Sequence, residues 1–195
     1  MTPRFLNGAA GGVLGALLAH WVVLAARAAT GAADVWLKGP HGPPFFELTL
    51  ATAAFYASVG AFAGPRRGAA ARSAKAAGAA FLALALPMAL ATRLFSWGET
   101  GPSFAWIYMI LGSYALANGS GAFAVGWTLG RSRAGLRALA GAGAAWAVDR
   151  LAQWAVFGGP QAPPVAGWLA PPAAVLSGLL WGEGIALAAA RRSAE

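Results

Sequence analysis

The chain has 195 residues, of which 58% are hydrophobic and only 10% are charged, and it contains no cysteine. So few polar residues cannot cover the water-facing surface of a globular protein of this size, which indicates a membrane protein. The absence of cysteine excludes disulfide bonds, thiol redox chemistry and cysteine-ligated metals. The formal net charge of +8 does not indicate a nucleic-acid-binding protein, because the basic residues are not gathered on one soluble face.

Six long apolar runs predict six transmembrane helices. At about 1.5 Å per residue, the runs are long enough to cross a hydrocarbon core roughly 30 Å thick, although the second and sixth are short. Lipid offers the backbone no hydrogen-bond partners, and the runs are continuous rather than alternating, so helices are predicted instead of a barrel. The whole chain, 1–195, is predicted to be a single all-α integral membrane domain. Its spans are predicted at about 5–28, 47–63, 76–96, 104–129, 137–158 and 172–190.

Basic residues mark every second boundary between these spans. They form four patches, Arg4, Arg66/Arg67/Arg72/Lys75, Arg131/Arg133/Arg137 and Arg191/Arg192. The opposite boundaries hold equal numbers of basic and acidic residues, Arg27, Lys38 and Arg93 against Asp34, Glu47 and Glu99. Because basic loops stay in the cytoplasm, this pattern predicts a multi-pass inner-membrane protein with three helical hairpins and both termini cytoplasmic. Anionic lipid headgroups are the expected partners of the cytoplasmic face.

Four polar residues fall near the middle of the predicted spans, Asn118, Asp149, Arg150 and Glu183, and Gln153 shares a helix face with Asp149. An unpaired charge at that depth costs roughly 2.5–3.5 kcal/mol, so these side chains are expected to converge inside the bundle. Arg150 is turned about 100° from Asp149 on a helix, which favours Glu183 as its partner. Two interpretations stay open: a polar binding site or proton-linked path, and an ion-pair network that only fixes helix register.

Three further residues are secondary candidates. His20 lies in the outer third of the first span, where an imidazole could sense protons or simply form an interfacial hydrogen bond. Arg93 aligns with Arg150 at an offset of 57 residues, and the same offset aligns Ser120 with Ser177, which indicates a repeated hairpin or a chance match in an Ala- and Gly-rich chain.

Metal and cofactor sites are not expected. The two histidines, His20 and His41, fall in different segments, so no ligand set is apparent and we expect no metal and no cofactor.

Small residues form a face along the first span and a Gly-x-x-x-Gly pair in the sixth. They are Gly8, Gly11, Gly12, Gly15 and Ala19, with Gly178 and Gly182. Such faces let helix backbones approach closely, either within the bundle or against a partner membrane subunit.

Ser120-Gly121-Ala122 and the segment 174–182 resemble the serine and histidine helices of rhomboid proteases, which also have six spans and an inside amino terminus. The resemblance implies that fold and places Ser120 at the nucleophile position. Asn118 stands where the family has glycine, and Val175 where it has the catalytic histidine. A catalytic serine needs a base, and no histidine occurs in the last three predicted spans. The alternative that this resemblance offers is therefore an inactive rhomboid-like membrane protein.

Size, six spans and inside termini are also similar to the substrate-binding components of energy-coupling-factor vitamin transporters. In that family an outer first loop closes over the ligand, and small residues on the first helix dock a partner. The corresponding loop here holds Trp36, Lys38 and His41.

These patterns favour a small-solute or ion permease, or a permease subunit, with a polar intramembrane site. The alternative is a non-catalytic structural or assembly subunit of a larger membrane complex. An enzyme is not expected, because the polar residues form no recognisable nucleophile–base pair.

Overall fold

The structure is a computed structural model that describes residues 3–30, 45–94, 104–157, 179–182 and 184–185. Within these ranges every regular element is a helix, so the all-helical fold is confirmed for this part of the chain. The main helices are α1 (Pro3–Thr30), α3 (Phe45–Phe62), α4 (Ala69–Leu94) and α5 (Phe104–Phe157). The predicted sixth span is described only at residues 179–182 and 184–185, which are helical.

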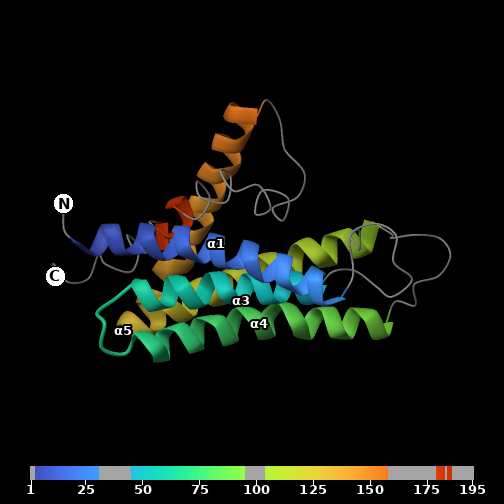
Figure 1. Ribbon diagram of the computed structural model, residues 1–195, viewed down its shortest axis with the longest axis horizontal. Helices are drawn as coiled ribbons and strands as arrows, with labels where there is room; N and C mark the ends of the chain where they lie inside the picture. The colour runs from blue at the N-terminus through green and yellow to red at the C-terminus, as the bar shows by residue number, and fades with distance from the viewer. Residues whose placement is uncertain (1–2, 31–44, 95–103, 158–178, 183, 186–195) are drawn as a thin grey trace.

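Helices α1, α3 and α4 run back and forth along one axis (Figure 1). α1 packs on α3, α3 on α4, and α4 on α5, and α1, α3 and α4 run side by side in alternating directions (Figure 1). α1 therefore begins at the end of the bundle where α3 ends and α4 begins. Residues 7–26 and 69–87 form the two described helical segments that are long and apolar enough to cross a membrane, and Thr49–Phe62 is apolar but shorter.

Helix α5 has 54 residues but is not straight. A Cβ added at Gly135 would lie 2.7 Å from the ring of Phe123, and one added at Gly119 would lie 2.9 Å from Leu139. Residues twelve positions apart would be about 18 Å apart along a straight helix, so α5 folds back on itself. We call residues 104–129 the first arm and residues 134–157 the second arm, which projects from the bundle (Figure 1).

The two arms coincide closely with the predicted spans 104–129 and 137–158, but the connection between them differs from the prediction. The sequence suggested a loop, whereas the backbone stays helical through the bend. Similarly, α4 begins at Ala69, seven residues before the predicted span, so Arg72 and Lys75 belong to a helix.

Glycines set the spacing between α1 and its neighbours. A Cβ at Gly15 would lie 2.8 Å from the carbonyl oxygen of Phe55, and the hydroxyl of Ser58 donates a 2.8 Å hydrogen bond to the Gly11 carbonyl. On another side of α1, a Cβ at Gly182 would collide with the backbone of Gly8 and Gly12. The glycines of α1 and Gly182 are therefore packed within the chain, and docking of a partner membrane subunit on this face stays a prediction.

The connection between α3 and α4 is fastened by Arg72. Its side chain is only 5% exposed and donates hydrogen bonds to four carbonyl groups, those of Gly60, Ala61, Pro65 and Arg67. Gly60 and Ala61 lie in the last turn of α3, whose carbonyls have no partners inside the helix. Gly68 completes the turn at a φ of 81°, in the left-handed region that favours glycine.

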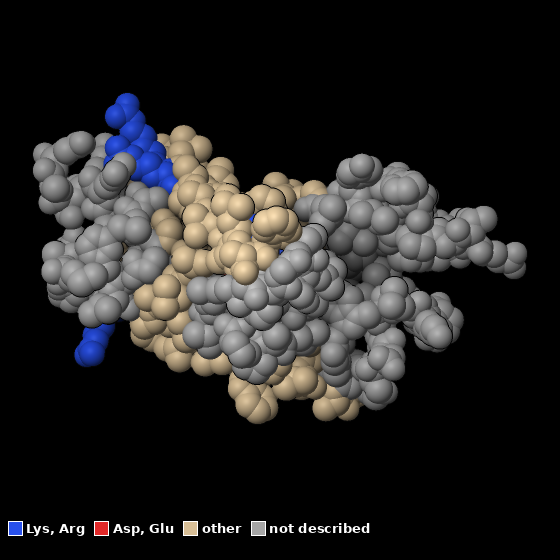
Figure 2. Space-filling model, turned by 90° about the horizontal axis from the view of Figure 1, so that it is seen from above, with Lys and Arg blue, Asp and Glu red and all other residues tan. Residues whose placement is uncertain are grey.

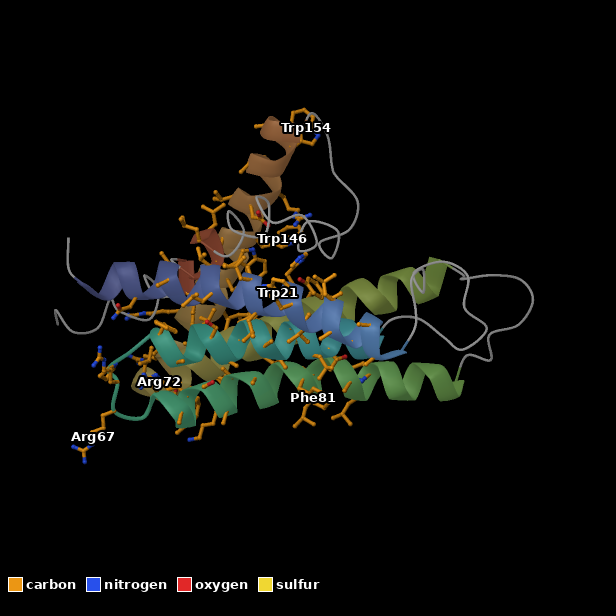
Figure 3. The ribbon with its side chains drawn as sticks, in the orientation of Figure 1. Trp21, Arg67, Arg72, Phe81, Trp146 and Trp154 are labelled. Carbon is orange, nitrogen blue, oxygen red and sulfur yellow. The ribbon has the colours of Figure 1, made fainter. Side chains whose placement is uncertain are left out.

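The surface along the helices is apolar, while several polar groups are buried. Leu151 is 69% exposed and Trp21 66% exposed, whereas Asp149 is 1% exposed. Trp154 is also exposed, and it marks the far end of the second arm (Figure 3). Exposed basic side chains project at one end of the molecule (Figure 2).

Candidate functional site

A buried polar contact joins α3 to the first arm of α5. The hydroxyl of Tyr56 donates a hydrogen bond to Oδ1 of Asn118 at 3.2 Å, and Nδ2 of Asn118 donates to the Tyr114 carbonyl at 2.8 Å. The contact depends on Gly121, because a Cβ there would lie 2.5–2.7 Å from three carbons of the Tyr56 ring. Because one end of the Asn118 amide accepts and the other donates, these two bonds fix its orientation.

Asp149 and Arg150, on the second arm, pair with each other. Nη2 of Arg150 lies 3.2 Å from Oδ2 of Asp149. The angle of about 100° between the two Cβ directions on the helix therefore does not keep these neighbours apart, because the long arginine side chain reaches back around the helix. Glu183, the partner predicted for Arg150, lies outside the described residues, so that contact stays a prediction.

Arg150 is not fully satisfied by this pair. Its Nε is buried and has no hydrogen-bond partner among the described residues. A buried guanidinium N–H without an acceptor costs free energy, which a bound water or solute would recover.

Asn118 and Arg150 line one cleft between the two arms, which we call the polar cleft. It has a volume of about 460 Å³ and largely apolar walls. Its lining residues are Tyr114, Ala115, Asn118, Gly119, Leu139, Ala142, Gly143, Trp146, Arg150 and Trp181. An apolar cavity with a few fixed polar groups is the usual form of a small-molecule site.

Of the other predicted site residues, His20 and Ser120 have described side chains, and neither is among the residues that line the polar cleft. His20 is partly buried on α1, and its ring meets Trp21 edge-on with centroids 6.2 Å apart. Ser120 is partly buried on the first arm. Arg93 lies in the last turn of α4 and Gln153 one turn beyond Arg150, and the side chains of both are outside the described residues.

Four aromatic residues of the site were not predicted: Tyr56, Tyr114, Trp146 and Trp181. Trp181 packs edge-on against Phe55 at 6.4 Å between centroids, and Trp181 and Ile185 belong to the same buried core as Phe55 and Tyr56. The sequence could have indicated Tyr56 and Tyr114, because each is a tyrosine inside an apolar span and a buried phenol needs a hydrogen-bond partner.

Comparison with known proteins adds no assignment: no family model, no curated protein and no solved structure matches the chain.

Proposed function

We propose that this protein is a multi-pass inner-membrane protein that binds a small solute or ion in the polar cleft, acting as a permease or permease subunit. The observation that carries the proposal is the cleft itself, where Asn118 and Arg150 from different arms of α5 face one cavity of about 460 Å³. Two arms that share a ligand site can change their separation as the ligand binds or leaves, which is the minimum a permease requires.

The membrane placement is supported by which side chains are exposed. Leu151 is exposed two positions after the buried Asp149, and Leu116 is exposed two positions before the buried Asn118. A surface in contact with water would favour the reverse pattern, whereas lipid favours apolar side chains outside and polar side chains inside.

The orientation is supported by the clustering of cations. A Cβ at Gly64 would meet Leu129 at 2.5 Å, so the α3–α4 connection lies against the bend of α5. The exposed Arg66, Arg67 and Arg133 therefore belong to one end of the bundle. Under the positive-inside rule, that end is cytoplasmic.

The binding role of the polar cleft can be tested with single cysteines, because the chain has none of its own. Ala115 and Gly143 line the cleft from opposite arms, and a Cβ at Gly143 meets nothing within 4 Å. Thiols react as thiolates in water, so Ala115→Cys and Gly143→Cys should be modified by a water-soluble maleimide in open membrane fragments.

The matched control is Leu116→Cys, next to Ala115 but 55% exposed on the outer surface of the first arm and not part of the cleft lining. If that surface faces lipid, this thiol should react at least about tenfold more slowly than the cleft thiols. Equal, slow reaction at Ala115→Cys and Leu116→Cys would mean a dry cleft and no permease. Fast reaction at Leu116→Cys would contradict the membrane placement itself.

An assembly subunit is the second candidate, and one observation favours it. The second arm projects from the bundle (Figure 1). Four large apolar side chains are exposed on it, those of Leu136, Val148, Leu151 and Trp154. A partner helix could cover that surface instead of lipid. Co-purification of a second membrane protein that is lost in a Val148→Ser/Leu151→Ser variant would support this function, and a monodisperse monomer in mild detergent would contradict it.

A further inference from the structure

A second cleft lies at the basic end of the bundle, between the start of α4 and the bend of α5. We call it the basic cleft. Its volume is about 500 Å³. Polar and apolar atoms both line it, whereas the walls of the polar cleft are largely apolar. It is lined by Pro65, Arg67, Gly68, Ala71, Arg72, Lys75, Trp127, Thr128 and Leu129.

Arg72 forms the floor of the basic cleft and carries a charge without an ionic partner in the described structure. Its guanidinium donates to backbone carbonyls, which satisfy its hydrogen bonds but do not neutralise it. In the described ranges the acidic residues are Glu47, at the opposite end of α3, and Asp149, which pairs with Arg150. A buried cation without a counter-charge favours an anion nearby.

Two more cations, Arg67 and Lys75, stand at the rim of the basic cleft. Both are exposed, and within the part of the chain that the structure describes neither side chain donates a hydrogen bond. Arg67 projects beyond the end of the bundle, whereas Arg72 lies within it (Figure 3). The cleft therefore joins three positive charges, and two of them keep their side-chain N–H donors available.

The basic cleft also has an apolar wall. Trp127 is 52% exposed, and it lines the cleft together with Leu129. Tryptophan is favoured where hydrocarbon meets headgroups, because its ring is apolar and its N–H is polar. A cleft with cations on one side and an exposed indole on the other matches a ligand that is anionic at one end and apolar at the other.

We propose that the basic cleft is a discrete binding site for a phosphate group, that of an anionic phospholipid at the cytoplasmic surface. Lys75 and Arg67 donate to the phosphate oxygens, the charge of Arg72 lies beneath them, and Trp127 packs against the glycerol and upper acyl region. The inference rests on the membrane placement proposed above, but not on the solute role of the polar cleft.

The test uses the full chain purified in mild detergent and mixed with equal amounts of phosphatidylglycerol and phosphatidylcholine, with native mass spectrometry as the readout. The wild type is expected to retain phosphatidylglycerol in preference. The double variant Arg67→Gln/Lys75→Gln should lose that preference about tenfold, because both phosphate donors are removed. Arg72 stays in place, so the α3–α4 connection remains fastened.

The matched control is Arg66→Gln/Arg133→Gln, which removes the same charge from exposed positions outside the cleft lining. Retention of the preference in this control supports a discrete site. An equal loss in both double variants, or no preference in the wild type, would overturn the proposal in favour of general attraction between charges.

A competition experiment identifies the source of the phosphate. Excess inorganic phosphate should leave phosphatidylglycerol bound, because it lacks the apolar part that Trp127 contacts. Displacement of the lipid by inorganic phosphate would instead assign the site to a free anion. A dry polar cleft in the cysteine experiment would remove the permease function but leave this result unchanged, so the two proposals fail separately.

Discussion

Tyr56 and Asn118 lie 62 positions apart in the sequence, yet the hydroxyl of Tyr56 donates a hydrogen bond to the side chain of Asn118. The bond fixes the amide at the edge of the polar cleft while Tyr56 itself is fully buried between α3 and α5. The orientation of a cleft residue is thus determined by a helix that does not line the cleft.

The variant Tyr56→Phe should keep the packing of the ring on Gly121 and lose only this hydrogen bond. Oδ1 of Asn118 would then lack the donor, and the protein should be destabilised by about 0.6–1.7 kcal/mol, the range for hydrogen bonds between helices in membranes. Thermal unfolding in detergent, followed by circular dichroism, measures the change. A double-mutant cycle with Asn118→Ala isolates the pair, and a coupling energy of zero would contradict the contact.

The pair formed by Asp149 and Arg150 predicts that removing one charge destabilises the protein more than removing both. Asp149→Asn leaves the guanidinium of Arg150, whose side chain is 25% exposed, without its carboxylate, which should cost about 1.5–3 kcal/mol. Asp149→Asn/Arg150→Gln removes both charges and should be more stable than the single variant. The measurement is the unfolding temperature of each variant under one detergent condition. A single variant as stable as the wild type would show that the carboxylate does not compensate the guanidinium.

The helices were predictable because composition and length decide where a helix can form in an apolar run. The bend of α5 was harder to predict. The sequence suggests a loop around Arg131 and Arg133, but residues 130–136 contain no proline, so nothing there forbids helical backbone. Charge marked the place where the chain turns, and the backbone conformation at the turn depended on packing between the two arms.

The candidate site was predictable in part. Asn118 and Arg150 were expected to meet inside the bundle because of their depth, and both line the polar cleft. Tyr56 was missed because its partner is remote in sequence. The Arg150–Asp149 contact was missed because the angle between Cβ directions on a helix does not limit a side chain as long as arginine.

Because α1 and α3 approach closely at Gly15, a larger side chain there should destabilise the protein, whereas one at an open position should not. A leucine at Gly15 would meet the backbone of Phe55 and should cost at least about 2 kcal/mol through overpacking. A Cβ added at Gly78, on α4, would meet nothing within 4 Å, so Gly78→Leu is the matched control. It should be neutral or stabilising, because leucine favours helix more than glycine. Equal stability losses, measured by thermal unfolding, would contradict the α1–α3 packing.

The four carbonyl contacts of Arg72 predict that it holds the α3–α4 connection closed. In Arg72→Gln the carbonyls of Gly60 and Pro65 lose a charged donor, and each such hydrogen bond contributes about 1.5–3 kcal/mol. Arg72→Lys should not restore them, because an ammonium cannot replace a planar guanidinium that donates to several carbonyls. Limited trypsin digestion reports the opening directly, since Arg66 lies in the same connection and should be cleaved faster in both variants.

The control for this experiment is Arg133→Gln, which removes one exposed positive charge at the same end of the bundle. Cleavage after Arg66 should keep its wild-type rate in that variant, because the hydrogen bonds of Arg72 remain. If Arg133→Gln opened the connection as much as Arg72→Gln, loss of charge alone would explain the effect. If Arg72→Lys behaved like the wild type, a single positive charge, and not the guanidinium's hydrogen bonds to the end of α3, would be what holds the helices together.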